Sequence, residues 1–477
     1  MSDTSEPPTV LYAPREPIFP RRVSGFFRNL KWYLMAFTLG IYYITPWLRW
    51  DRGPNLPDQA VLLDIAHRRF YFFWIEIWPH EFYFVGGLLI MAGLGLFLFT
   101  SALGRVWCGY ACPQTVWTDL FILVERWIEG DRNARLRLHR QKRWDFRKVR
   151  LRVTKWLVWL VIGLLTGGAW VFYFADAPTL ARDLVSLNAH PIAYTTVAIL
   201  TGTTFFFGGF FREQICIYAC PWPRIQAAMM DEETITVGYR AWRGEPRKHS
   251  AEAESSANLG DCIDCMACVN VCPVGIDIRD GQQMECITCA LCIDACDDVM
   301  ARIGKPRGLV DYMALSDEPL ERTGKPPRGI WTHILRPRTI MYTTLWSLVG
   351  IGMVFALFVR SHIDLSIAPV RNPVYVTLSD GSIRNTYDIR VRNQSNTEST
   401  FRIFASAHPQ IRIRLEGSPY ESLTIGAQEL QRQRVYVTAA PTSEPAISER
   451  TPVRFWVEDL ANGDRAHKDT VFFGTGN

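Results

Sequence analysis

The chain has 477 residues, of which 48% are hydrophobic, and a formal net charge of +5. This length predicts two to four structural units. The basic residues gather in loops beside apolar segments, which is typical of membrane topology and argues against a nucleic acid partner. All twelve cysteines lie between Cys108 and Cys296, so thiolate ligands are favoured over the disulfides of a secreted protein.

Five apolar segments are long enough to cross the hydrocarbon core of a bilayer. Aromatic residues at their ends argue against buried helices of a large soluble protein. The first 20 residues contain five prolines and no apolar stretch, so we expect a short disordered tail and no cleavable signal peptide. The predicted spans are Trp32–Leu48, Phe82–Leu103, Trp156–Ala175, Ile192–Phe211 and Thr339–Val359.

Lysine and arginine residues predict the orientation of these spans. Residues 1–31 carry five of them and loop 104–153 carries twelve, whereas 49–81 carries four and 176–191 carries one. By the positive-inside rule, the N-terminus, loop 104–153 and segment 212–338 lie in the cytoplasm. The sequence therefore predicts five membrane crossings, with the N-terminus in the cytoplasm and the C-terminal domain on the opposite side.

Two near-identical motifs stand at the predicted cytoplasmic ends of the second and fourth spans. They are CGYACP, with Cys108 and Cys112, and CIYACP, with Cys216 and Cys220. Residues four apart share one face of a helix, so each pair can point the same way. If the two copies pack about a pseudo-twofold axis, the four sulfurs converge.

The surroundings of the motifs also repeat, which predicts a duplicated two-helix unit. Arg105 and Arg212 precede the two cysteine pairs and favour thiolate over thiol, while His80 and His190 begin the same two spans on the outer side. Three functional interpretations remain open: the thiolates bind Cu(I), hold a further iron–sulfur cluster, or cycle between dithiol and disulfide. A structural interpretation, in which the cysteines only pack as small buried residues, is less favoured because the motif is duplicated.

Eight further cysteines form a doubled C-x2-C-x2-C-x3-C run between the fourth and fifth spans. This spacing is typical of a bacterial ferredoxin with two [4Fe–4S] clusters, in which the last cysteine of each run serves the other cluster. Asp297 replaces the proline that usually follows the second run, and structural zinc is the less favoured alternative. The predicted ligand sets are Cys262, Cys265, Cys268 and Cys296 for cluster 1, and Cys272, Cys286, Cys289 and Cys292 for cluster 2.

Histidines and acids near the predicted outer face form a weaker candidate site. His67, His80 and His190, with Glu76 and Glu81 nearby, could hold a metal ion or a quinone headgroup. Histidines are common at membrane interfaces, however, and this simpler explanation is favoured.

The C-terminal residues change to period-two alternation, as in Thr386–Asn393, Thr400–Ser406 and Thr451–Asp459. About seven short strands predict an immunoglobulin-like β-sandwich without cysteines, for which a docking or scaffold role is expected. The predicted architecture is therefore a cytoplasmic tail (1–31), a four-helix membrane domain (32–230), a cytoplasmic ferredoxin domain (231–338), a fifth membrane helix (339–359) and the sandwich (360–477).

The segments Trp107–Phe121 (WCGYACPQTVWTDLF) and Cys216–Gln226 (CIYACPWPRIQ), with the doubled run and the tail, resemble the cytochrome c oxidase accessory proteins of the CcoG/FixG/RdxA type. The first half is also similar to the quinol-linked membrane ferredoxins of the NapH and NosR kind. The resemblance implies a role in the assembly of cbb3-type haem–copper oxidases and the reduction of Cu(II) to Cu(I). It also implies a bacterial inner membrane, with the C-terminal domain in the periplasm. It makes Cys108, Cys112, Cys216 and Cys220 the candidate copper-handling or electron-transfer thiols.

Three functions follow as hypotheses. The first is a cupric reductase that takes electrons from a cytoplasmic donor, and the second is an electron-transfer subunit that links quinol to a periplasmic redox partner. The third is a scaffold that recruits oxidase subunits through the sandwich. The sequence leaves the number of chains open, a homo-oligomer included.

Overall fold

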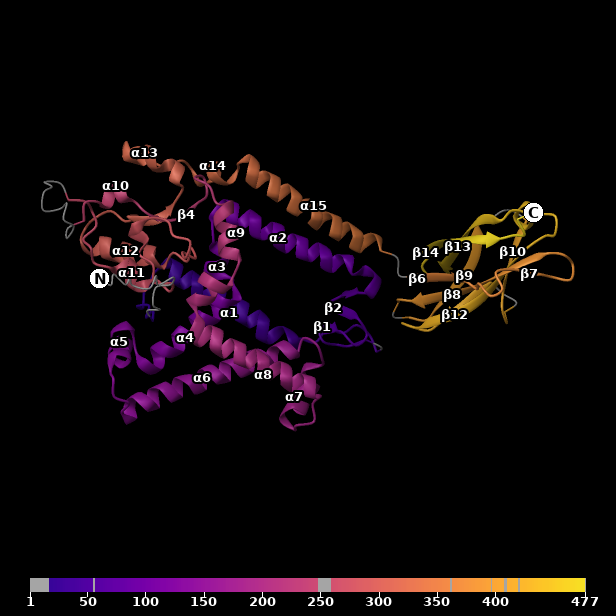
Figure 1. Cartoon of the computed structure of the whole chain (residues 1–477), viewed down its shortest axis with the longest axis horizontal. Coiled ribbons are helices and arrows are strands. Elements are labelled where there is room, and N and C mark those ends of the chain that lie inside the picture. Colours follow the sequence, from indigo (N-terminus) through magenta and orange to yellow (C-terminus); the bar gives the residue numbers. More distant parts are fainter. Residues whose placement is uncertain are drawn as a thin grey trace, which may run out of the picture. The chain divides into compact units, whose positions relative to one another are not determined.

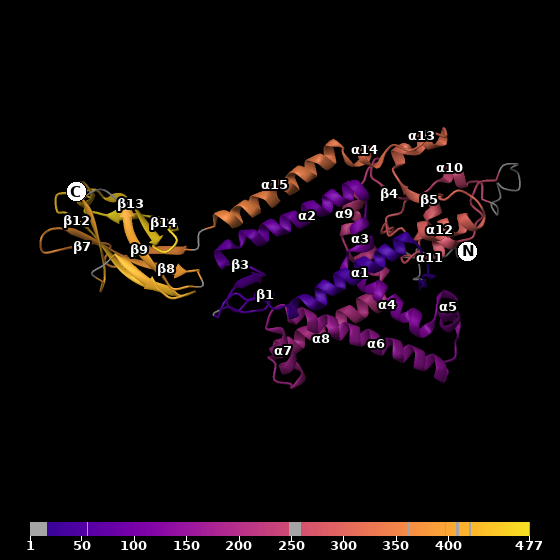
Figure 2. The ribbon, with the colours of Figure 1, turned by 180° about the vertical axis from the view of Figure 1, so that it is seen from behind.

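A computed structural model describes residues 17–54, 56–247, 259–360, 363–395, 397–406, 410–418 and 421–476 (Figures 1 and 2). The described residues form two compact units. Unit 1 comprises those up to Trp50 and Gln59–Ile351, and unit 2 comprises those within Asp51–Asp58 and from Gly352 onward. The predicted membrane and ferredoxin domains thus share unit 1.

Four helices of the described chain are long and apolar enough to cross a membrane. Their outer faces carry exposed apolar side chains such as Leu89, Leu165 and Phe355, as expected for contact with lipid. These helices match the second to fifth predicted spans. They are α2 (Tyr83–Leu103), α6 (Phe146–Val171), α8 (Pro191–Phe206) with its π-helical continuation η3 (Phe207–Phe211), and α15 (Pro337–Val359).

The first predicted span is helical but differs from the other four. Helix α1 (Phe26–Ile44) begins six residues before the predicted start at Trp32, and it does not meet the same apolar criterion. Arg28 and Lys31 lie in its first two turns, each 3% exposed, and both contact the Asp119 carboxylate at 3.2 Å. The fifth crossing therefore stays a prediction.

The predicted disordered tail is partly ordered. Residues 1–16 lie outside the described chain, but residues 17–24 pack on α4 (Pro113–Glu129) and α5 (Arg132–Arg140), which fold within loop 104–153. Arg135 donates a hydrogen bond to the Pro20 carbonyl at 2.6 Å, and Phe19 is only 8% exposed. Backbone carbonyls held by buried arginines explain why a proline-rich segment is ordered here.

The connection between the first two spans contains a three-stranded antiparallel sheet that the sequence did not predict, and short helices join the remaining parts. The strands are β1 (Val61–Asp64), β2 (Arg69–Phe72) and β3 (Ile75–Ile77). The helices are η1 (Thr45–Trp47), η2 (Pro79–Glu81), α7 (Ala177–Val185), α10 (Ala241–Gly244), η5 (Ile278–Asp280), η6 (Leu315–Asp317), α13 (Glu318–Arg322) and α14 (Ile330–Ile334).

The ferredoxin fold contains α11 (Ala267–Val271), α12 (Leu291–Arg302) and an antiparallel pair of strands, β4 (Thr236–Tyr239) and β5 (Val310–Met313). Pro273 follows α11, which ends two residues earlier, because proline cannot continue a helix. The second run has Asp297 at the equivalent position, and α12 runs on to Arg302. The Asp297 carboxylate instead accepts a hydrogen bond from the Gly308 N–H at 2.9 Å.

Unit 2 confirms the immunoglobulin-like sandwich. Its two antiparallel sheets have the strand orders β10–β12–β8–β6, with β7 paired to β8, and β11–β9–β13–β14. Tyr387, Val437 and Phe455 are fully buried between them. Strands β6, β7 and β11 add to the alternating segments seen in the sequence. The elements are β6 (Ile363–Pro369), β7 (Val376–Thr377), β8 (Ile383–Asn393), β9 (Ser399–Ser406), β10 (Ile411–Leu415), β11 (Ser422–Ile425), β12 (Leu430–Ala439), α16 (Glu444–Ile447), β13 (Arg450–Asp459) and β14 (Arg465–Phe473).

Candidate electron-transfer site

The two cysteine motifs share a backbone path. In each, a long helix breaks at a residue with positive φ, Gly104 at 62° and Arg212 at 40°. A short helix then carries the first cysteine of the motif, α3 (Val106–Tyr110) in one copy and the π-helix η4 (Ile215–Ala219) in the other. The duplicated unit predicted from the sequence is therefore present in the fold.

The second cysteine of each motif does not continue the short helix. Cys112 and Cys220 are extended, with ψ of 128° and 125°, and the prolines that follow stand at the start of the next helices, α4 and α9 (Trp222–Met229). Proline is favoured there because the first N–H groups of a helix have no intrahelical partner. The prediction of one continuous helical face for each pair is thus wrong, because the helix ends between the two cysteines.

The two motifs cross, so that the first cysteine of each lies near the helix that follows the other. The Cys108 thiol donates a hydrogen bond to Gln226 Oε1 on α9 at 3.1 Å. Cys216 lines a small cavity together with Thr115 and Thr118 of α4. Cys220 lies close enough to Cys108, and Cys108, Cys112 and Cys220 lie close enough to Cys216, to raise the pKa of Cys108 and Cys216. The four cysteines therefore lie in one region, as a pseudo-twofold arrangement predicts, although no three of them are placed to hold a single metal ion.

Burial and the clustering of sulfur shape the acidity of these thiols. Burial raises the pKa of Cys108, and burial with the neighbouring cysteines raises the pKa of Cys216 to about 12. The Arg105 guanidinium opposes both shifts. Arg212, predicted to do the same, instead forms an ion pair with Glu125 at 2.6 Å. Protonated thiols are suited to release protons when they bind a metal ion.

The eight ferredoxin cysteines surround two small cavities of similar size. Cys268 lines both. The walls are otherwise largely apolar, which suits a sulfur-ligated cluster because it excludes water. The four cysteines that the spacing groups together line the same cavity in each case: Cys262, Cys265, Cys268 and Cys296 line one, and Cys272, Cys286, Cys289 and Cys292 line the other.

The two runs wrap their cavities with the same backbone. The residues on either side of the second cysteine are left-handed in both runs, Asp264 and Met266 around Cys265, and Thr288 and Ala290 around Cys289. Non-glycine residues adopt this conformation at a cost of about 1 kcal/mol. Its recurrence at equivalent positions indicates that both loops are shaped for the same kind of ligand. Where [4Fe–4S] clusters are bound, these cysteines supply the thiolates and the clusters supply one-electron redox chemistry.

Within the described residues, His, Cys, Asp and Glu side chains form no group of three or more placed to hold a single metal ion. The cysteines of each run are spread around a cavity, which fits a cubane better than a zinc ion bound by sulfurs at about 2.3 Å. No copper site of three or more such ligands is therefore preformed among the described side chains.

The structure does not bring the outer histidines and acids together. His67 pairs with Asp64 at 2.7 Å, and His190 accepts a hydrogen bond from the Ile192 N–H at 3.3 Å. Both imidazoles, and that of His80, are exposed. The predicted neighbours have structural roles: Glu76 pairs with Arg69 at 3.2 Å, and Glu81 accepts a hydrogen bond from the Trp78 N–H at 3.0 Å.

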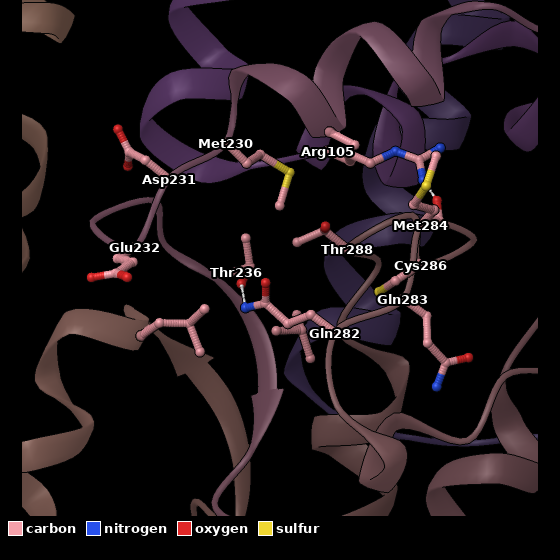
Figure 3. A pocket seen from close by; sticks show the side chains of 13 residues that line it. Arg105, Met230, Asp231, Glu232, Thr236, Gln282, Gln283, Met284, Cys286 and Thr288 are labelled. Carbon is pink, nitrogen blue, oxygen red and sulfur yellow. Dashed lines mark hydrogen bonds between the residues drawn. The ribbon is translucent and has the colours of Figure 1, made fainter.

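A cavity of about 350 Å3, which no sequence motif indicated, adjoins the second cysteine run (Figure 3). Met230 at the end of α9 and Thr236 of β4 line it from one side, and Gln282 and Cys286 line it from the other. Gln282 donates a hydrogen bond to the Thr236 hydroxyl across it. A cavity of this size can hold a small organic molecule beside a candidate cluster ligand.

Comparison with known proteins places the chain in a family. It is 68% identical to protein RdxB and 64% identical to protein RdxA of Cereibacter sphaeroides, over 98% and 95% of both chains. It is 52% identical to the nitrogen fixation protein FixG of Rhizobium meliloti, over 90% of this chain and 87% of that protein. The chain belongs to the FixG/RdxA family.

Three domain families match parts of this FixG/RdxA protein. Residues 211–315 match a 4Fe-4S dicluster domain, and 353–475 match the IG-like fold at the C-terminus of FixG. Residues 84–132, which include Cys108 and Cys112, match a 4Fe-4S binding domain. The crystal structure of a FixG-related protein from Vibrio parahaemolyticus aligns with 24% of this chain and 99% of its own, at 15% identity and a TM-score of 0.22. The protein is a membrane iron–sulfur electron-transfer protein.

Proposed function

We propose that this protein reduces Cu(II) to Cu(I) at the four motif cysteines, with electrons from its iron–sulfur clusters, and that it acts in the assembly of cbb3-type cytochrome c oxidases. The observation that carries this proposal is the contact between the motif and the ferredoxin fold. Cys108 packs against a group of buried apolar side chains that includes Ile287, Cys289 and Leu291 of the second cysteine run.

The chemistry of copper fits this arrangement. Reduction of Cu(II) takes one electron, and a [4Fe–4S] cluster delivers one at a time, so each copper ion reduced leaves one cluster oxidised by one electron. Thiolates prefer Cu(I), and each thiol that binds the ion releases its proton. A cytoplasmic donor then restores the reduced cluster.

The orientation in the membrane is part of the proposal. The distribution of lysine and arginine supports a cytoplasmic N-terminus and ferredoxin fold and a periplasmic sandwich. Copper reduction then takes place near the cytoplasmic side, while the sandwich contacts oxidase subunits or assembly factors on the other side.

An anaerobic assay on the purified, prereduced protein tests the reductase activity. Cu(II) is added, and Cu(I) is trapped by a coloured chelator specific for that oxidation state. We expect the wild type to be active and the Cys216→Ser/Cys220→Ser variant to lose most of the activity. The His80→Ala/His190→Ala variant is the matched control and should stay active, because both imidazoles are exposed and remote in sequence from the motifs. Full activity in the double serine variant would contradict the assigned role of the second motif.

A second candidate, electron entry from a quinol, is favoured by the cavity beside Cys286. The Met230→Trp substitution would place a bulky ring in that cavity and narrow it. If quinol is the donor, a water-soluble quinol should reduce the clusters of the wild type and not those of this variant. Dithionite should reduce both. Clusters that stay oxidised in the wild type after quinol addition would exclude this donor.

A pure scaffold makes a different prediction. Removal of the residues after Arg360 would abolish oxidase assembly and leave copper reduction intact, since the motifs and the ferredoxin fold lie in unit 1. If variants without motif cysteines still support assembly in cells, the scaffold explanation replaces the reductase.

A further inference from the structure

The two cysteine motifs differ at one internal position, and the structure explains the difference. Gly109 of CGYACP lies directly on the second cysteine run: a Cβ there would be 2.6 Å from the Ile287 carbonyl oxygen and 3.1 Å from the backbone N and Cα of Cys289. Real Cβ atoms do not approach backbone this closely, so only glycine allows the contact. The equivalent residue of CIYACP is Ile217, whose side chain is half-buried.

The tyrosines of the two motifs also differ, and again the residue of the first motif is the one that contacts the second cysteine run. Tyr110 is 6% exposed, and its hydroxyl donates a hydrogen bond to the Cys289 carbonyl at 3.1 Å. Its counterpart Tyr218 is 56% exposed. One tyrosine therefore anchors the cluster-binding loop, while the other lies largely at the surface.

The arginines that precede the motifs complete the asymmetry. Arg105 is 3% exposed, donates a hydrogen bond to the Met284 carbonyl just before the second run, and lies close enough to Cys108 and Cys286 to act on both. Arg212 lines the same small cavity as Cys216, but its guanidinium is ion-paired with Glu125 and makes no such bond to the second run among the described contacts. Arg105 is thus the cation that bridges the motif cysteines and the ferredoxin fold.

A small cavity lies between Cys216 of the second motif and this region. Cys216 lines a small cavity whose other walls include Pro273, Val274 and Ile287. The first motif therefore makes direct backbone and side-chain contacts with the second run, whereas Cys216 is separated from it by a cavity. Since electron transfer slows steeply as the gap between donor and acceptor widens, the two motifs are not equivalent as electron acceptors.

We propose that the first motif is the contact through which electrons leave the ferredoxin fold, with Arg105, Gly109 and Tyr110 as positioning residues that hold the second cysteine run against Cys108. The cavity lined by Cys272, Cys286, Cys289 and Cys292 then holds the cluster nearest the motifs, and the cluster of the other cavity lies upstream. The second motif supplies ligands and receives electrons only through the shared site. This order of electron transfer rests on the proposed function, which identifies copper as the final acceptor. It adds to that function the sequence in which the two clusters and the two motifs pass the electron.

Matched variants of the two motifs test this order. The Gly109→Ala variant forces the cluster-binding loop away, and Ile217→Ala is its control in the second motif. Both proteins are first shown to hold wild-type amounts of iron and sulfide. The clusters are then reduced, and their reoxidation is followed by absorbance in a stopped-flow instrument, once with Cu(II) and once with ferricyanide, a small oxidant that has no need of the thiols.

With Cu(II), we expect reoxidation of Gly109→Ala to be about tenfold to a hundredfold slower, because a displacement of about 1 Å can have a hundredfold effect on a positioned reaction. Ile217→Ala should stay within about twofold of the wild type, since its substitution displaces no cluster-binding backbone. Ferricyanide should oxidise all three proteins equally fast. Equal Cu(II) rates for Gly109→Ala and the wild type, or equal slowing in both variants, would overturn the proposal.

A copper-free measurement separates this proposal from the proposed function. An EPR-monitored redox titration of Tyr110→Phe should show a lower midpoint potential for one cluster only, because the Cys289 carbonyl loses a hydrogen-bond donor. Tyr218→Phe should match the wild type. If the wild-type clusters are not oxidised by Cu(II), the reductase function is wrong. The titration still tests whether the first motif contacts the cluster held by the second cysteine run. An unshifted potential in Tyr110→Phe would overturn it.

Discussion

The Asp294 carboxylate accepts hydrogen bonds from the backbone N–H groups of Arg28 and Phe27, at 2.7 and 3.2 Å. Asp294 lies on α12 between two candidate cluster ligands and caps the N-terminus of α1, where a carboxylate is favoured by the unpaired N–H groups. A Cβ on Gly25 would lie 2.3 Å from the Asp294 carboxyl carbon, so the two segments are in close contact. The ferredoxin fold is thus joined to the first helix as well as to the first motif.

We expect Asp294→Ala to weaken this junction by about 0.5–2 kcal/mol, the usual effect of removing an N-cap side chain. The measurement is the rate of proteolysis near residues 25–28 and the thermal unfolding of the purified protein. Asp298→Ala is the control, because Asp298 is on the same helix and its side chain is half-exposed and paired with Arg302. Equal stability of both variants would show that the cap contributes nothing.

Substitution of Arg105 by glutamine should make the motif thiols less reactive. The Arg105 charge opposes the rise in the pKa of Cys108 that burial causes, so its removal should move that pKa further up. The alkylation rate of Cys108 at pH 8, read by mass spectrometry, should fall, because only the thiolate reacts. Arg224→Gln, an exposed residue of α9, is the control. An unchanged alkylation rate in Arg105→Gln would show that the Arg105 charge does not affect Cys108.

Iron content should distinguish the ligand sets. The wild type is expected to hold about eight irons, and Cys296→Ser or Cys286→Ser about four, since each variant loses one cluster. The Cys112→Ser variant should keep about eight if the motifs hold no cluster of their own. Iron above that level in the wild type, lost in Cys112→Ser, would instead support the further cluster suggested by the domain match at residues 84–132.

Acid should weaken the junction between the ferredoxin fold and α14. Burial alone would raise the pKa of Asp317, but hydrogen bonds from Arg328 and His333 outweigh it, so the pKa lies below its usual range. A depressed carboxyl pKa gives stability that is present above the unfolded value of about 3.9 and lost as pH falls through the folded value. The wild type should therefore lose more stability than Asp317→Asn between neutral pH and about pH 3. Parallel unfolding curves for the two proteins would contradict this.

The sandwich should depend on a buried tyrosine. The Tyr387 hydroxyl donates a hydrogen bond to the Val471 carbonyl at 2.7 Å, from a side chain that is fully buried. Tyr387→Phe is expected to lower the free energy of unfolding by about 0.5–1.5 kcal/mol, the net value of one such bond. Urea unfolding of the full chain, followed by a probe in the sandwich, measures this. Tyr436→Phe, with an exposed hydroxyl, serves as the control.

Several properties of this protein follow from the sequence by itself. The spacing of the eight cysteines predicted the two sets that line the two cavities, because in a two-cluster ferredoxin each cluster takes three cysteines of one run and the last cysteine of the other. Apolar runs predicted α2, α6, α8 and α15, and alternation predicted the sandwich, since both patterns reflect which side chains avoid water. These patterns depend on residues that are close together in the sequence, so they can be recognised without knowing the tertiary structure.

Only the tertiary structure shows which of two equivalent residues in the repeated motifs contacts the cluster-binding loop. Arg105 and Arg212 occupy the same place in the repeat, yet one lies beside sulfur and the other beside a carboxylate, because different helices pack around them. Gly109 and Ile217 differ in sequence without apparent reason until the second cysteine run is seen against one of them. Packing between segments far apart in the sequence makes the two copies of the motif different. The spacing of residues does not show which copy contacts the ferredoxin fold.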